Sequence, residues 1–231
     1  MNKFCVALVS AVFVGGVLVA GGAKAIDLPD LASKQGYSIG YQLGLDFKLK
    51  EIVISPESLL AGINEALAGN EPSLTKQQMS QVITELQKRV EEKRLALFQK
   101  VAEENKQHGE KFLAENGTKE GVVTLPSGLQ YKVVADGNGQ KPTANSTVTV
   151  NYRGTLPDGT EFDSSFARGK AATFPVNRVI PGWTEALQLM PVGSKWLLYV
   201  PAALAYGERG SAPKIGPNLP LVFEVELISA E

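Results

Sequence analysis

Two residue types on which many enzymes rely are almost missing from this chain of 231 residues. It contains one cysteine, Cys5, and one histidine, His108. From that inventory we expect no zinc site, no Cys–His pair and no Ser–His–Asp triad. The sequence therefore predicts a function that needs neither a metal ion nor a cofactor.

The chain also lacks an excess of charge of either sign. Its 23 lysine and arginine residues balance 24 aspartate and glutamate residues, which leaves a net charge of −1. No strongly basic block stands out, so we expect no nucleic-acid partner. A hydrophobic content of 44% is normal for a globular protein, and the length allows one large domain or two modest ones.

The first 25 residues have the pattern of a secretory signal. Lys3 gives a positive start, residues 4–22 are apolar and small, and Ala23-Lys24-Ala25 is an A-x-A cleavage site. Cleavage would also remove Cys5, and a chain without cysteine is compatible with an oxidising compartment. An uncleaved membrane anchor is the alternative, because the apolar run is long enough for one.

Three helices are predicted before residue 122. Residues 30–48 carry an apolar stripe at helical spacing, and Gly36, Gly40 and Gly44 fall along one line of that helix. Small residues in line allow another helix to approach closely, although a merely weak helix is the alternative. The next helix should begin at Ser55-Pro56.

The third predicted helix is unusually long. Thr75 and Gln78 form a capping-box pattern, and no proline or glycine follows until Gly109. If it continues to about Glu115, it spans roughly 60 Å at ~1.5 Å per residue. Its second half, rich in Glu, Lys and Gln, is typical of a solvated spacer. The alternative is two ordinary helices separated near Gly109.

Beyond a boundary at residues 117–126, the hydrophobic period changes from helical spacing to two. Residues 147–152, 194–200 and 221–228 alternate as strands do, and residues 182–190 form a short amphipathic helix. The sequence therefore predicts an α+β protein. An all-α N-terminal region and a long connecting helix precede an antiparallel sheet wrapped around one short helix.

An ordered series of aromatic and aliphatic residues lies within the strand-rich half. The series contains Tyr152, Phe162, Asp163, Phe174, Val179, Ile180, Trp183, Tyr206 and Phe223. Only Asp163 is charged, and no nucleophile stands beside a base. Such a set is suited to a water-excluding pocket for a compact apolar ring, which is how a protein would hold proline. Taken singly, residues such as Tyr152 and Phe223 could instead be plain sheet core.

The segments that carry this series resemble a known family. FDSS, VIPGW and AYG followed by LVFEVEL, in this order and spacing, resemble the FKBP-type peptidyl-prolyl cis–trans isomerases over about residues 122–231. The upstream half, roughly 26–121, is similar to the N-terminal dimerisation region of the macrophage infectivity potentiator (Mip) group of bacterial FKBPs. YSIGYQLG, LTKQQM and IGPN support that narrower resemblance.

The resemblance implies a fold, an activity and a set of site residues. It implies a sheet wrapped over one helix, with Trp183 at the pocket floor, that catalyses rotation about X–Pro bonds. The catalytic group would be Tyr152, Phe162, Asp163 and Tyr206. The substrate-binding group would be Phe174, Val179, Ile180, Trp183, Ile215 and Phe223.

The resemblance also implies partners and an organisation. Proline-containing peptides and unfolded client proteins would be substrates, rapamycin-type macrolides would inhibit, and the chain would form a homodimer in the periplasm or at the bacterial cell surface. The predicted parts are a signal peptide (1–25), a helical dimerisation domain (26–74), a connecting helix and linker (75–121) and the isomerase domain (122–231). A proline-binding chaperone without catalysis and a surface-interaction module are the alternatives.

Two positions depart from the family pattern. Lys214 stands where many FKBPs have an aliphatic residue, in a loop (207–217) that should overhang the pocket, so a preference for acidic neighbours of proline is possible. At the expected dimer contact, Ile63 and Leu67 stand where some Mip proteins use methionine. Hydrophobicity is kept there, so we still expect a dimer.

Overall fold

The chain divides into two units, and the division falls between Ser73 and Leu74. A computed structural model describes residues 26–231, so the predicted signal segment, residues 1–25, lies outside the described residues. Within the described part, no helix is long and apolar enough to cross a membrane.

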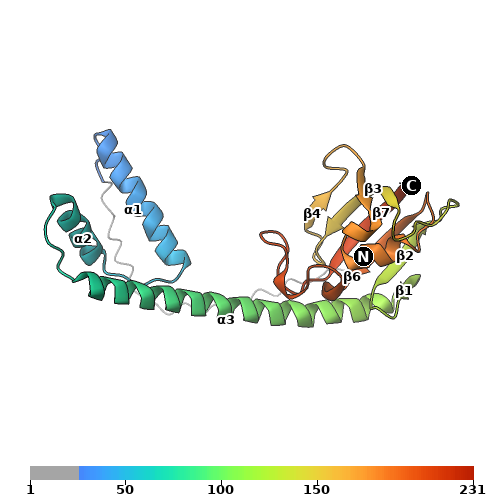
Figure 1. Cartoon of the computed structure of the whole chain (residues 1–231), viewed down its shortest axis with the longest axis horizontal. Coiled ribbons are helices and arrows are strands. Elements are labelled where there is room, and N and C mark those ends of the chain that lie inside the picture. Colours follow the sequence, from blue (N-terminus) through green and yellow to red (C-terminus); the bar gives the residue numbers. More distant parts are fainter. Residues whose placement is uncertain (1–25) are drawn as a thin grey trace, which may run out of the picture. The chain divides into compact units, whose positions relative to one another are not determined.

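The first unit contains two helices, α1 (Leu31–Leu49) and α2 (Pro56–Ala68) (Figure 1). Each begins at a residue whose side chain accepts a backbone N–H, which satisfies a donor that the first turn leaves free. Asp30 accepts from Ser33 at 2.7 Å, and Ser55 accepts from Ser58 at 3.1 Å. Both predicted helix starts are thus confirmed.

The two helices have no core of their own. Neither contains a buried residue, and Leu67 is 83% exposed. Their apolar side chains surround a groove of about 860 Å³. Its lining includes the residues predicted to meet a second chain: Gly36, Gly40, Gly44, Leu60, Ile63 and Leu67. A side chain added at any of those three glycines would meet no atom of this chain within 4 Å.

The predicted long helix is one continuous element, α3 (Lys76–Gly117), and it begins with the predicted capping box (Figure 1). Thr75 and Gln78 each bind the other's backbone N–H. The alternative of two helices separated near Gly109 is wrong. Gly109 lies where the helix passes Pro220, whose Cδ would be 2.8 Å from an added Cβ. Glycine is there to permit close approach, and it does not end the helix.

The C-terminal part of α3 packs on the sheet domain, which corrects the expectation of a solvated spacer. The Asn105 side chain donates to the carbonyl of Pro217 at 2.8 Å, and that of Asn218 donates to Ala102 at 3.1 Å. Asn116, fully buried, donates to the Gln130 side chain at 2.9 Å. These polar side chains look solvated in sequence, but their partners lie more than a hundred residues away or across the linker.

The second unit is built on one antiparallel sheet (Figure 1). Its strands are β1 (Val122–Thr124), β2 (Gln130–Ala135), β3 (Thr147–Thr155), β4 (Glu161–Ser164), β5 (Ala172–Pro175), β6 (Lys195–Val200) and β7 (Leu221–Ala230). The order is β1-β2-β6-β7-β3-β4, and β5 pairs with β3. The three predicted strands are β3, β6 and β7, which form adjacent central positions.

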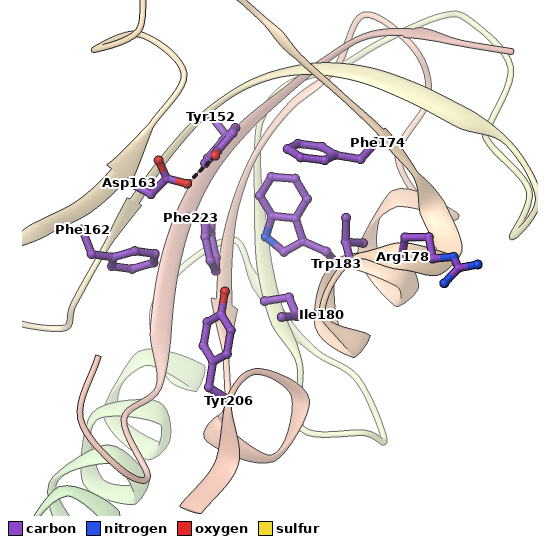
Figure 2. A pocket seen from close by; sticks show the side chains of 10 residues that line it. Tyr152, Phe162, Asp163, Phe174, Arg178, Ile180, Trp183, Tyr206 and Phe223 are labelled. Atoms are coloured by element: carbon purple, nitrogen blue, oxygen red, sulfur yellow. Dashed lines mark hydrogen bonds between the residues drawn. The ribbon is translucent and has the colours of Figure 1, made fainter. Parts of the chain in front are cut away.

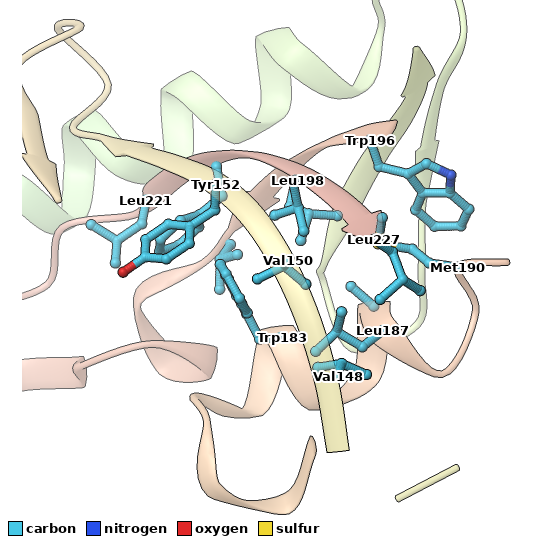
Figure 3. Packing of buried hydrophobic residues seen from close by; sticks show 14 of the residues in the cluster. Val148, Val150, Tyr152, Trp183, Leu187, Met190, Trp196, Leu198, Leu221 and Leu227 are labelled. Atoms are coloured by element: carbon cyan, nitrogen blue, oxygen red, sulfur yellow. The ribbon is translucent and has the colours of Figure 1, made fainter. Parts of the chain in front are cut away.

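A single short helix, α4 (Pro181–Leu187), covers the concave side of this sheet. Trp183 and Leu187 of the helix point toward Val150 of β3 and Leu198 of β6, and all four are buried (Figure 3). Burying apolar surface in this way is the main stabilising contribution to folding. The predicted architecture, a sheet wrapped around one helix, is confirmed.

Candidate functional site

A cavity of about 420 Å³ opens between α4, the strands β3, β4 and β7 and the segments that follow β5 and β6 (Figure 2). Nine of the ten predicted site residues line it. They are Tyr152, Phe162, Asp163, Phe174, Val179, Ile180, Trp183, Tyr206 and Phe223, and Arg178 completes the lining. The sequence places these residues on elements up to 71 positions apart, and the sheet brings them around one space.

Trp183 forms the floor of the pocket and is 4% exposed. It lies in the first turn of α4, which Pro181 starts with a preset backbone angle. The rings of Tyr152 and Phe223 meet it edge-on, with ring centres 5.2 Å away in each case. Phe174 meets it at 6.1 Å. Edge-to-face contacts of this kind fix the orientation of each ring, so the floor is rigid.

The indole N–H of Trp183 is buried without a hydrogen-bond partner in the described chain. Figure 2 shows the nitrogen on the side of the indole that faces Phe223. The two rings are inclined by 81°, with ring centres 5.2 Å apart, so the neighbour on this side of the indole is an aromatic ring and not a conventional hydrogen-bond acceptor.

One polar network borders this apolar space. The Tyr152 hydroxyl donates to Asp163, and the Arg168 guanidinium donates both to Asp163 and, at 2.7 Å, to the Tyr152 oxygen. The backbone N–H of Ser164 adds a fourth bond, to Asp163 at 2.9 Å. Asp163 is therefore held in one position on β4 beside the pocket.

The network sets the ionisation of both side chains that face the pocket. Partial burial disfavours the charged form of Asp163, but hydrogen bonds from Tyr152 and Arg168, together with the charge of Arg168, outweigh it and lower the pKa of Asp163. Burial raises the pKa of Tyr152, and its bond to Asp163 raises that pKa further. At neutral pH the carboxyl is ionised and already bonded, so it is poorly suited to act as a general base.

Two donors of the lining are free to bind something else. Tyr206 is 42% exposed, and its hydroxyl makes no hydrogen bond to any described residue. Figure 2 shows this hydroxyl directed toward Phe223, between Phe162 and Ile180. The backbone N–H of Ile180, at the start of α4, likewise has no acceptor within residues 26–231. Both donors are positioned to bind carbonyl oxygens of a guest.

The tenth predicted residue, Ile215, is not in the lining. It is 6% exposed and belongs to the core, and its backbone pairs with Ser211 within the loop 207–217. Its neighbour Lys214 extends from that loop to β4, where the ammonium donates to the carbonyl of Phe162 at 2.7 Å. This cross-link attaches the loop to the strand that carries Phe162 and Asp163.

Arg168 and Arg178 are site residues that the sequence analysis missed. Arg168 lies five positions after Asp163, beyond the FDSS segment, and Arg178 lies two positions before Ile180. An arginine in a polar loop is usually solvated surface, so neither position gave a signal. For Arg168, the only available cue was the need of a partly buried carboxylate for a counterion.

The chemistry open to this pocket is limited by its contents. Its lining offers rings, two aliphatic side chains, two phenols, one bonded carboxylate and one guanidinium. Within residues 26–231, no group of three His, Cys, Asp or Glu side chains is placed to hold a metal ion. The arrangement can enclose an apolar ring, remove water from around it and donate hydrogen bonds to its neighbouring carbonyls.

Two family profiles match the chain. The one described as "FKBP-type peptidyl-prolyl cis-trans isomerase" matches residues 138–228. The one described as "Domain amino terminal to FKBP-type peptidyl-prolyl isomerase" matches residues 32–133. Together they include α1–α3 and nearly all of the sheet.

Individual relatives are similar in sequence to this chain over most of its length. Outer membrane protein MIP of Legionella longbeachae is 49% identical over 219 residues, which is 94% of each chain. An FKBP-type 22 kDa peptidyl-prolyl cis-trans isomerase of Escherichia coli is 47% identical and covers 86% of this chain and 95% of its own. The crystal structure of FkpA from Escherichia coli is 37% identical, with a TM-score of 0.73 over 89% of this chain and 99% of that one.

Proposed function

The chain belongs to the FKBP-type peptidyl-prolyl cis–trans isomerases, and we propose that it accelerates X–Pro rotation in exported proteins by desolvating the proline and favouring the twisted amide. The observation that carries this mechanism is the set of rings around Trp183, with two unused hydrogen-bond donors in the same pocket.

The reaction requires little conventional chemistry. The barrier of an X–Pro bond, ~18–20 kcal/mol, arises because twisting removes amide resonance, and no bond is broken. An enzyme lowers it by binding the twisted state more tightly than the planar one. A dry pocket helps because water stabilises the polar planar amide, and each ~1.4 kcal/mol of preference is a tenfold gain in rate.

Each part of the pocket receives a role in this mechanism. The rings of Trp183, Tyr152, Phe174 and Phe223, with Val179 and Ile180, enclose the proline ring. The Tyr206 hydroxyl binds one substrate carbonyl and the Ile180 N–H binds a second. Phe162 and Asp163 lie beside the carbonyl that rotates, where Asp163 contributes a fixed charge and does not transfer a proton.

An isomerisation assay tests the enzymatic proposal directly. The full chain without its first 25 residues should accelerate cis–trans exchange of short X–Pro peptides, and a rapamycin-type macrolide should inhibit it by occupying the same rings. A folded protein that binds such peptides without accelerating exchange would instead be a proline-binding module.

Single substitutions test the two polar roles. We expect Tyr206→Phe to lower kcat/KM about fivefold, because one hydrogen bond contributes on the order of 1 kcal/mol. Asp163→Ala should cost more, since it also leaves Tyr152 and Arg168 without their shared acceptor. Stopped-flow kinetics on one peptide measures both. If both variants keep full isomerase activity on the peptide and are inhibited by the macrolide as strongly as the parent, the assigned roles are contradicted.

The groove of the first unit supports a homodimer. A pair of helices with no buried residue and a continuous apolar face is too small to be stable alone. Two copies that join through the lines of Gly36, Gly40 and Gly44 and of Leu60, Ile63 and Leu67 would cover that face. A symmetric, self-complementary contact of this kind is the commonest form of oligomer.

We expect such a dimer to act as a folding chaperone as well. Two linked pockets bind one unfolded chain more strongly than either does alone, because the second contact becomes intramolecular. The signal-like N-terminus and the name of the Legionella relative, an outer membrane protein, support a place in the bacterial cell envelope.

A further inference from the structure

The mouth of the pocket carries more positive than negative charge. Only two of its ten lining residues are charged, Asp163 and Arg178. Asp163 is already paired with Arg168, which bonds to one of its two carboxylate oxygens while Tyr152 bonds to the other. The charge that remains unneutralised in the lining is therefore that of Arg178.

Arg178 is placed to act on groups outside the enclosed space. It ends the short helix Val176–Arg178 just before the pocket segment Val179–Ile180. Figure 2 shows its guanidinium at the edge of the pocket, directed away from the aromatic rings. Within residues 26–231 its side chain makes no hydrogen bond and no ion pair. All five of its N–H donors are free.

A second unneutralised cation lies on the Phe162 side of the pocket, which Figure 2 places opposite Arg178. The Lys214 ammonium donates to the Phe162 carbonyl. That bond uses one of three N–H donors and supplies no compensating negative charge. The two acidic neighbours of Phe162 do not compensate it, because Glu161 is paired with Arg153 at 2.8 Å and Asp163 is paired with Arg168.

We propose that Arg178, with Lys214 in a supporting role, makes this enzyme select proline segments that carry an acidic residue next to the proline. The inference rests on the proposed function, in which the proline ring fills the pocket. The flanking residues of the peptide then lie over the rim, within reach of a side chain that ends there. Carboxylates are the natural partners of a free guanidinium, which binds them through two parallel hydrogen bonds.

The size of the effect is limited by solvent. Exposed ion pairs contribute little, so the preference for Glu over Gln beside the proline should be about threefold to fivefold in kcat/KM. It should shrink with salt, because the screening length falls from about 10 Å at 0.1 M to about 3 Å at 1 M.

The experiment compares matched peptides on the full chain without its first 25 residues. One pair carries Glu or Gln immediately before the proline, and a second pair carries Glu or Gln immediately after it. We expect a Glu/Gln ratio of kcat/KM of about threefold to fivefold in at least one pair at low salt. Arg178→Gln should bring that ratio close to one, and Lys214→Gln should lower it less.

A charge-matched control separates a local contact from net charge. Lys119, in the turn after α3, is exposed and lies outside the pocket lining. Lys119→Gln removes the same charge and should keep the Glu/Gln ratio of the parent. Equal rates on Glu and Gln peptides in both pairs, or a ratio that Arg178→Gln leaves unchanged, would overturn the inference alone. A lack of acceleration on the Gln peptides as well would overturn the proposed function and this inference with it.

Discussion

Trp183→Ala is expected to lower kcat/KM for X–Pro peptides by about 100-fold or more. The substitution removes the floor against which Tyr152, Phe174 and Phe223 are oriented, and with it both the shape and the dryness of the pocket. A loss of about 3 kcal/mol of preferential binding to the twisted amide corresponds to that factor. Cis–trans exchange kinetics on a short peptide, measured at a temperature where the variant is folded, gives the loss of kcat/KM.

The same variant should be less stable, so a control for folding is needed. A buried tryptophan replaced by alanine costs about 3–5 kcal/mol. Trp196 provides a matched case, because it is 5% exposed and stacks on Tyr131 at 4.3 Å but lies outside the pocket lining (Figure 3).

Trp196→Ala should lose a similar free energy of unfolding in urea and keep its kcat/KM. If both tryptophan variants lose activity in proportion to stability alone, Trp183 has no special role at the floor.

Gly40→Leu should convert the dimer into a monomer. Gly40 lies in the groove between α1 and α2, where an added side chain meets no atom of its own chain. In the proposed dimer that space belongs to the other copy, so a leucine there would prevent close approach. Light scattering or analytical ultracentrifugation at micromolar concentration measures the change.

The first unit also contains a matched control outside the groove. Gly62 lies within α2, has no atom within 4 Å of an added Cβ and is not in the groove lining. Leucine favours helix over glycine by almost 1 kcal/mol at either site, so a weakened helix cannot explain a difference between the variants. Gly62→Leu should remain a dimer. A dimeric Gly40→Leu protein would place the interface elsewhere.

The two dimer variants also separate catalysis from chaperone action. Gly40→Leu should keep its activity on a short peptide, because the pocket lies in the other unit. It should refold a large client protein less efficiently, because the gain from two linked pockets is lost. Equal refolding by Gly40→Leu and Gly62→Leu would show that a single pocket is sufficient.

Most of the helices and the central strands could be predicted from local sequence patterns. Capping at Ser55 and Thr75 and two-residue alternation over 147–152 gave correct helix starts and a correct central strand, because these signals depend on neighbours in the sequence. The strands β1, β2, β4 and β5 were not identified. They have three to six residues each, and tertiary pairing determines them.

The site residues that match the family pattern, including the charged Asp163, could be predicted from the sequence, whereas the two arginines were missed. Nine lining residues were expected because their order matches a family pattern. Arg168 was not expected, since its role depends on a partner that the loop after β4 brings within bonding distance. Ile215 was placed in the pocket by resemblance, whereas the loop turns its side chain into the core. Loop conformation, which short-range patterns specify poorly, accounts for both cases.

The continuity of α3 past Gly109 has a mechanical consequence. Its C-terminal turns are attached to the sheet domain by Asn105, Asn116 and Asn218, so this end of the helix is fixed to the domain that carries the pocket. An α-helix bends little, and this one has 42 residues. A rotation of about 5° at its first turn therefore displaces its far end by about 5 Å, given a rise of ~1.5 Å per residue. In the proposed dimer, a small change of angle near Ser73 would therefore be amplified by the length of α3 into a displacement of the pocket relative to a bulky client.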